Sequence, residues 1–183
     1  MSDEIKKQQA FAWKLRNDRL WYMENFLKIR DKKSQLVPFI VNDAQKQFNK
    51  TIEENTKNNK PHRYIILKAR QLGMSTFTEG YIYHNTTTRP FVNSLIICHE
   101  DKASTNLFNM SKLFYETSPE AIKPMKKHSN GKELVFENPT QETGEKLINP
   151  GLRSKIAIAT AGANDTARSN TYHNVHVSEI AFF

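Results

Sequence analysis

The chain has 183 residues, of which 38% are hydrophobic and 25% charged, an ordinary globular composition with room for one sizeable core. The formal net charge is +8, which is compatible with a nucleic-acid partner and equally with a lysine-rich solvated surface. A single cysteine excludes an intramolecular disulfide and favours a reducing compartment. The histidines show no metal-ligand spacing, and no apolar run approaches the length of a membrane span.

The first part of the chain predicts helices. Residues 5–33 carry apolar side chains at helical spacing, namely Phe11, Leu15, Tyr22, Phe26 and Ile29. Such a helix can pack on a core, contact a partner or contact DNA, and packing is the simplest interpretation. Pro38 ends this helix, and Asn42 or Asp43 can cap a second one. The polar residues 49–62 are interpreted as a helix end and a linker.

From residue 63 onward, predicted strands and helices alternate. Strands are expected at 63–68, 91–98, 133–136, 155–159 and 175–177. Helices are expected at about 75–86 and from Asp101 onward, with a short helical piece within 119–127. The alternation predicts an α/β fold with a mostly parallel, helix-covered sheet. Ligands in such sheets bind beyond the carboxyl ends of the strands.

Residues 68–76 follow a predicted strand and precede a predicted helix, which is the layout of a phosphate-binding loop. Their sequence is Lys68-Ala69-Arg70-Gln71-Leu72-Gly73-Met74-Ser75-Thr76. In the standard pattern G-x-x-x-x-G-K-[ST], Gly73 and Ser75 match the second glycine and the hydroxyl residue. Met74 takes the lysine position, and Lys68 takes the position of the first glycine.

These residue types suit a nucleoside triphosphate with Mg²⁺. Gly73 lets the backbone approach phosphates, and the Ser75 hydroxyl is placed to ligate the metal. Lys68 could reach across the loop to supply the missing ammonium group. Arg70 offers a guanidinium for charge on the γ-phosphate. The alternative is an ordinary strand-turn-helix with two surface cations.

Four further positions complete the candidate site. Glu179 ends an apolar strand, as in a Walker B element, and could act as general base on water. Ser178 stands where such elements carry Asp and could reach a metal weakly or through water. Arg168, in the polar loop 160–171, could stabilise transition-state charge. Gln45 could contact an adenine edge. Taken singly, Glu179 is a typical salt-bridging residue, and Arg168 and Gln45 are typical surface residues.

Together and in this order, these elements resemble the ATPase domain of bacteriophage terminase large subunits, which package DNA into proheads. Residues 68–76 look like the deviant Walker A of that family, in which the lysine sits at the start of the loop. Asn42-Asp43-Ala44-Gln45 is similar to its adenine-recognising Q motif, and His176–Phe183 to a Walker B variant with Ser in place of Asp. Arg168 falls where members carry an arginine proposed to act in trans. The resemblance spans roughly residues 37–183.

The resemblance implies a P-loop NTPase fold of the additional-strand catalytic glutamate class. It implies a helical lid segment over residues 1–60 and an ATPase core over 61–183. Its cofactors would be ATP and Mg²⁺, with the nucleotide held by Gln45 and by Lys68, Ala69, Arg70, Gln71, Leu72, Gly73, Met74, Ser75 and Thr76. The metal would be held by Ser75 and Ser178. The catalytic residues would be Glu179, Arg70 and Arg168.

The implied partners are double-stranded DNA, the portal protein, the terminase small subunit and further copies forming a ring on the portal. The implied location is the cytoplasm of an infected bacterium and not the mature virion. The resemblance also implies an ATPase fragment that stops after Walker B, without the nuclease domain, and turns over weakly or not at all. Two alternatives remain from the residues: a helicase-like P-loop translocase, or a basic nucleic-acid-binding module with an inactive nucleotide loop.

Overall fold

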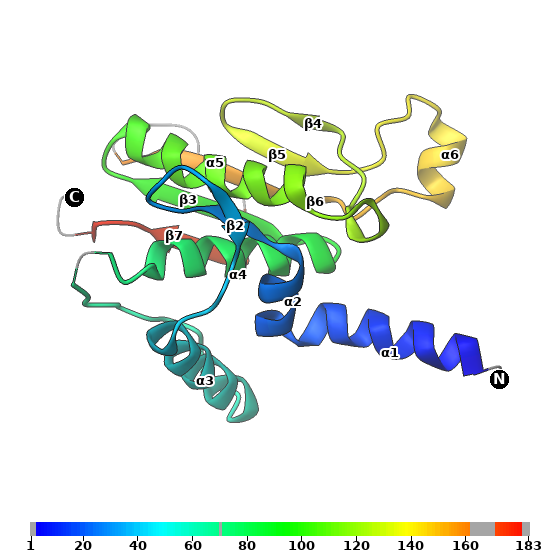
Figure 1. Cartoon of the computed structure of the whole chain (residues 1–183). Coiled ribbons are helices and arrows are strands. Elements are labelled where there is room, and N and C mark those ends of the chain that lie inside the picture. Colours follow the sequence, from blue (N-terminus) through cyan, green and yellow to red (C-terminus); the bar gives the residue numbers. More distant parts are fainter. Residues whose placement is uncertain (1–2, 70, 162–170, 181–183) are drawn as a thin grey trace.

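The computed structural model describes residues 3–69, 71–161 and 171–180 (Figure 1). Its centre is a five-stranded sheet in the order β4-β5-β6-β3-β7. The strands are β3 (Asn93–Cys98), β4 (His128–Ser129), β5 (Glu133–Phe136), β6 (Ser154–Thr160) and β7 (Asn174–Val177). Strands β6, β3 and β7 are parallel, whereas β4 and β5 join as antiparallel strands. The α/β class is therefore confirmed, but the sheet is mixed where a mostly parallel one was expected.

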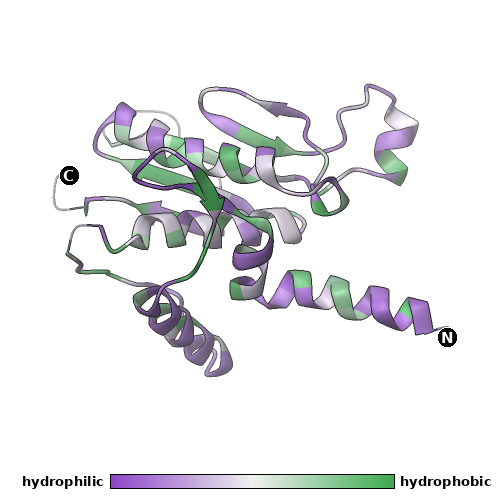
Figure 2. Ribbon diagram, in the orientation of Figure 1, coloured by the Kyte–Doolittle hydropathy of each residue, from purple (hydrophilic) through white to green (hydrophobic). Residues whose placement is uncertain are grey.

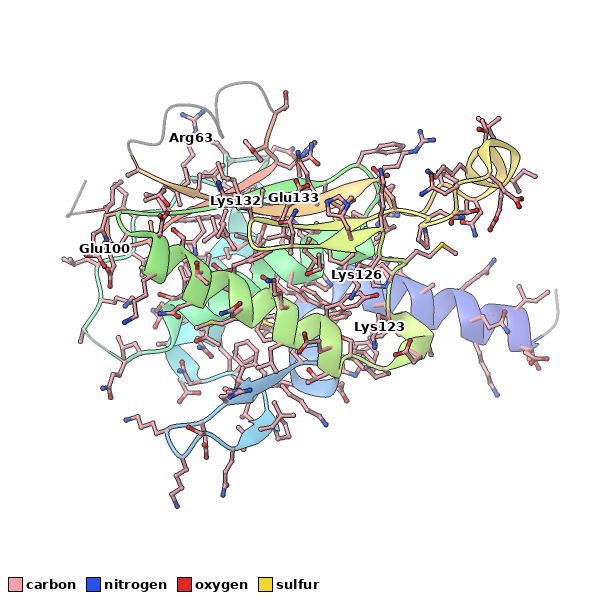
Figure 3. All side chains as sticks on the ribbon, turned by 90° about the horizontal axis from the view of Figure 1, so that it is seen from above. Arg63, Glu100, Lys123, Lys126, Lys132 and Glu133 are labelled. Carbon is pink, nitrogen blue, oxygen red and sulfur yellow. The ribbon has the colours of Figure 1, made fainter. Side chains whose placement is uncertain are left out.

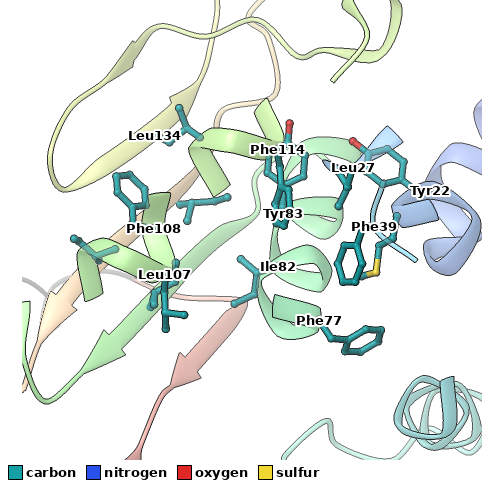
Figure 4. Packing of buried hydrophobic residues seen from close by; sticks show 14 of the residues in the cluster. Tyr22, Leu27, Phe39, Phe77, Ile82, Tyr83, Leu107, Phe108, Phe114 and Leu134 are labelled. Atoms are coloured by element: carbon teal, nitrogen blue, oxygen red, sulfur yellow. The ribbon is translucent and has the colours of Figure 1, made fainter. Parts of the chain in front are cut away.

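Helices α4 (Met74–Thr88) and α5 (Asp101–Thr117) pack against each other and against strands β3 and β6. The core lies between these helices and the sheet (Figure 4). It contains Ile82 and Tyr83 from α4, Phe108 and Phe114 from α5, and Leu134 from β5. Cys98 is also buried in this core, as its apolar neighbours in the sequence indicated, and burial raises the pKa of its thiol.

The N-terminal region differs from the single helix expected over residues 5–33. It forms α1 (Asp3–Asn17) and α2 (Arg19–Phe26), separated at Asp18, whose carboxylate accepts the Trp21 N–H at 3.0 Å and caps α2. Residues 28–33 are not helical, because Asp31 accepts the N–H groups of Lys33 and Gln35 and folds a tight turn. That turn joins the antiparallel strands β1 (Lys28–Arg30) and β2 (Leu36–Pro38).

Helix α3 (Asp43–Lys57) begins at the expected place, with Asn42 as its N-cap. Its surface is largely hydrophilic, in contrast to β3 (Figure 2). From α2 and the end of the hairpin, Tyr22, Met23, Leu27 and Phe39 enter the same core as α4 and α5. The two regions expected on either side of residue 60 thus share one hydrophobic core.

The strand predicted over residues 63–68 is absent. This segment is extended but pairs with no described strand, and Ile65 and Leu67 are 94% and 101% exposed. Its start is instead held on α3, where Tyr64 packs on Phe48 and the Asn55 side-chain amide donates to the Tyr64 hydroxyl at 3.1 Å. The apolar run resembled a buried strand, but hydrophobicity alone does not supply a hydrogen-bonding neighbour.

The remaining predicted elements are largely confirmed. The expected strands beyond residue 90 correspond to β3, β5, β6 and β7, and the helical piece within 119–127 is reduced to the 3-10 helix η1 (Glu120–Ile122). Strand β4 and helix α6 (Thr143–Ile148) were not anticipated. Within the described ranges, no helix is long and apolar enough to cross a membrane.

Candidate phosphate site at the amino end of α4

The amino end of α4 carries no side-chain cap. The chain enters the helix through Gln71 and Gly73, both with left-handed backbone angles (φ 64° and φ 68°). Gly73 is the N-cap, and α4 starts at Met74. The first N–H groups of a helix have no partner within the helix, so they point outward and attract anions. A left-handed turn followed by a helix is thus present over residues 71–76, whereas the strand expected before the turn is absent.

Side chains from α3 and the β1–β2 hairpin hold this loop in place. The Gln45 amide nitrogen donates to the Gly73 carbonyl at 2.8 Å, and the Asn42 amide nitrogen donates to the Leu72 carbonyl at 3.2 Å. From the hairpin, the Lys32 ammonium group donates to the Gln71 side chain at 2.9 Å. Three side chains distant in sequence therefore fix three consecutive residues of the loop.

Gln45 lies beside the loop but is already engaged. Its side-chain oxygen accepts the Asn42 N–H at 2.9 Å, completing a capping box at the start of α3, and its nitrogen binds Gly73. The residue is 3% exposed. Its expected contact with adenine stays a prediction, and the structure adds a role that the sequence analysis did not assign to it, that of joining α3 to the loop.

The cations and hydroxyls of the loop are only partly brought together. Met74 is buried, so its side chain belongs to the core and not to the loop surface. Ser75 and Thr76 are half-buried in the first turn of α4. Lys68 is exposed and forms no ion pair with a described residue, and it precedes the loop from a segment outside the sheet. Arg70 lies outside the described residues.

The second half of the candidate site is the carboxyl end of β7. The Ser178 N–H donates to the Ile97 carbonyl at 2.9 Å, which extends the parallel ladder by one step. Glu179 follows with φ 57°, a left-handed conformation that is unfavourable for a residue with a Cβ. Arg168, on the connection before β7, lies outside the described residues.

His99 lies beside Glu179, a juxtaposition that the sequence analysis missed. Strands β3 and β7 pair with Ile97 opposite Val177, so the residues two positions further along each strand meet at the same edge of the sheet. The His99 Nδ1 atom is 3.6 Å from a Glu179 carboxylate oxygen, and its Nε2 atom is 3.5 Å from Glu100. The parallel pairing of the two strands, once assumed, could have revealed this neighbour.

A buried carboxylate links α4 to β7 behind this edge. Glu79, in the second turn of α4, is completely buried, and its carboxylate is 2.6 Å from the Nδ1 atom of His176 on β7. Burial raises the pKa of Glu79, and the hydrogen bond and charge of His176 oppose that effect. The contact joins the helix that follows the loop to the strand that carries Ser178 and Glu179.

The amino end of α4 and the carboxyl ends of β3 and β7 lie on the same side of the molecule (Figure 1). The groups gathered there are backbone N–H donors, the hydroxyls of Ser75 and Ser178 and the Glu179 carboxylate. These are the donor types that phosphates and Mg²⁺ accept. In the described part of the chain, no cluster of three or more His, Cys, Asp or Glu side chains could hold a metal by itself.

Comparison with known proteins returns no match, either to a protein-family model or to a curated protein.

Proposed function

We propose that the chain binds Mg-ATP at the amino end of α4 and is the ATPase domain of a viral DNA-packaging motor of the terminase large-subunit type. One observation carries the proposal. The amino end of α4, which has no side-chain cap and is entered through left-handed Gly73, lies on the same side of the molecule as the strand end that bears Ser178 and Glu179. An anion-binding helix terminus and a potential general base at one sheet edge suit hydrolysis of a phosphoanhydride.

Each residue type at this edge has a role in the proposal. The backbone amides of residues 74–76 would bind phosphate oxygens, and Ser75 and Ser178 would contribute oxygen ligands to Mg²⁺. Bound Mg²⁺ would neutralise charge on the phosphates. Glu179 would orient and deprotonate the attacking water, and His99 would hold its carboxylate. Lys68 would supply a cation from the start of the loop, with Arg70 and Arg168 as further candidates.

The motor role adds partners and a location to the proposal. In the cytoplasm of an infected bacterium, the chain would contact double-stranded DNA, the portal protein, the small subunit and further copies in a ring.

The basic turn after α5 is one surface that DNA could contact. Figure 3 shows Glu100 at one end of α5 and Lys123 and Lys126 near the other end. Lys123 pairs with Glu120, and Lys127 lies 3.0 Å from Glu137. These pairs leave the turn at 123–127 with less unpaired charge for DNA than its sequence suggests.

A titration with a fluorescent ATP analogue tests the nucleotide site. Saturable binding that requires Mg²⁺ is expected, and Lys68→Ala is expected to weaken it about tenfold because a phosphate contact is lost. Lys60→Ala removes the same charge from an exposed position upstream and serves as the matched control. Equal affinities of the two variants would remove Lys68 from the site. In the full-length protein, Lys68→Ala and Glu179→Ala are both expected to abolish DNA packaging.

A second candidate function is a basic nucleic-acid-binding module whose loop does not take ATP. It is favoured by the position of Lys68 in an exposed segment outside the sheet. This candidate predicts no Mg-dependent saturation with the ATP analogue. It also predicts binding to duplex DNA that weakens steeply with salt and does not change with sequence. A helicase-like translocase would instead bind the analogue and unwind or translocate on DNA without a prohead.

A further inference from the structure

A cavity of about 790 Å³ lies at the opposite end of α4 from the phosphate loop. Helix α1, the end of α4 and η1 line it. Its polar lining includes Arg16 and Arg89, and its apolar lining includes Trp13, Leu15 and Ile122. Trp13 is 66% exposed, which is unusual for the largest apolar side chain in proteins. Nothing in the proposed nucleotide chemistry uses this cavity.

The two arginines that line the cavity, Arg16 and Arg89, have no carboxylate partner among the described residues. Neither guanidinium group has a carboxylate oxygen of a described residue within 4.0 Å. Burial lowers the pKa of Arg89, and the positive charges of Arg16 and Arg19 lower it further. Half-buried like charges are unfavourable unless an anion balances them. The site therefore has a deficit of negative charge.

The guanidinium groups are positioned to receive an anion. Arg89 donates to the Arg16 carbonyl at 2.8 Å, to Asn85 at 2.6 Å and to Thr88 at 3.2 Å, so its plane is fixed at the end of α4. An arginine has five N–H donors, so further donors remain for a ligand. Arg16 is exposed beside it. Fixed guanidinium groups pair with carboxylates in a bidentate manner.

We propose that this cavity binds an acidic segment of a partner protein, with carboxylates on Arg16 and Arg89 and an apolar side chain against Trp13 and Ile122. Tryptophan and arginine are the residues that most often dominate protein–protein contacts. A nucleic-acid backbone fits the site less well because the cavity is concave and partly apolar. Lys14, the lysine nearest to Arg16 in the sequence, has its ammonium nitrogen 4.4 Å from the centre of the Trp21 ring and is thus already engaged.

Two fluorescein-labelled, capped octapeptides of alternating residues test the proposal, one of Asp and Leu and the other of Asn and Leu. The Asp peptide is expected to bind saturably, and the Asn peptide about tenfold more weakly or not at all. Arg16→Glu is expected to weaken the Asp peptide at least tenfold, and Trp13→Ala severalfold. Lys132→Glu, the same charge change at an exposed position in the β4–β5 turn, is expected to leave binding within about twofold.

Three outcomes would overturn the proposal. The first is that the Asp peptide does not bind. The second is that Lys132→Glu weakens binding of the Asp peptide as much as Arg16→Glu does, which indicates long-range electrostatics. The third is that a DNA oligonucleotide displaces the Asp peptide in an Arg16-dependent way, which indicates a nucleic-acid site. Unchanged thermal unfolding of Arg16→Glu shows that the variant is folded, and Arg16→Gln replaces it if it is not. Since ATP takes no part in these measurements, the result is independent of the nucleotide site.

Discussion

Glu79 has an environment that is unusual for a carboxyl group. It is a carboxyl group with no exposed surface, paired with His176 across 97 positions of sequence. Its pKa is raised by burial, so the folded state binds a proton on this group more tightly than the unfolded state does. Its contribution to stability is therefore full below the ordinary Glu pKa and is lost as the pH rises through the folded pKa.

Glu79→Gln removes this pH dependence while retaining a polar side chain of similar volume. The free energy of unfolding of the variant, relative to the wild type, is expected to rise as the pH increases above the ordinary Glu pKa. Urea denaturation over pH 4–8 measures the difference. Glu116→Gln removes an equivalent charge from an exposed position on α5 and controls for net charge. A difference that stays flat with pH in Glu79→Gln would contradict the raised pKa.

Glu179 illustrates a trade-off between stability and the proposed catalysis at one residue. Its left-handed backbone costs about 1 kcal/mol for any residue with a Cβ, and glycine does not incur this cost. Glu179→Gly is therefore expected to be about 1 kcal/mol more stable than Glu179→Ala, although both lack the carboxylate. Thermal unfolding of the two variants measures this difference. If alanine proves equally stable, the positive φ is not a feature of the protein in solution.

At the scale of elements, Gly73 decides whether the loop can join α3 to α4. A Cβ at this position would lie 2.9 Å from the Gln45 amide nitrogen, and φ 68° disfavours a side chain. Gly73→Ala is expected to destabilise the fold by about 1–2 kcal/mol and to reduce affinity for the ATP analogue. Gly131→Ala is the matched control, since its Cβ would have no neighbour within 4 Å. Denaturant unfolding that shows equal effects in both variants would contradict this account.

Much of the element order followed from local signals in the sequence. Asn42 as a cap, the apolar strands on either side of α5, and the glycine before α4 are each readable from a few neighbouring residues. The β1–β2 hairpin was missed because Ile29 continues a helical spacing while Asp31 folds a turn through its own side chain. The contacts between Glu79 and His176 and between His99 and Glu179 depend on strand register, which no local pattern specifies.

The segment 63–68 shows that a local pattern can also predict a strand that does not form. Its composition predicts a strand, and only the packing of the whole chain determines whether a neighbouring strand is available. Of the candidate site residues, Gly73 and Ser75 lie at the amino end of α4, on the same side of the molecule as Ser178 and Glu179 at the carboxyl end of β7. It leaves Lys68 in an exposed segment and gives Gln45 partners in α3 and the loop.

For the whole molecule, the exposed apolar side chains of segment 63–68 favour self-association. Ile65 and Leu67 are almost completely exposed, and Val175 and Val177 on the edge strand β7 are 52% and 36% exposed. Exposed apolar residues and an unpaired strand edge promote contacts between chains. The double variant Ile65→Thr/Leu67→Thr is expected to reduce concentration-dependent association severalfold with little loss of stability.

Sedimentation velocity over a range of protein concentrations measures this association. Leu147→Thr, a similar change at a 75% exposed position on α6, is the control and is expected to leave association unchanged. A large drop in the unfolding temperature of the double variant would show instead that the segment contributes to the folded core.

Because Met74 is buried, the conformational entropy of the loop is lost when the protein folds and not when a ligand binds. As the first residue of α4, Met74 is anchored in the core, and Gln45 holds the preceding carbonyl. The first-turn amides are thus oriented during folding, before any anion arrives. An anion binding there loses little affinity to immobilising the chain, so most of the interaction energy with those amides remains available as binding free energy.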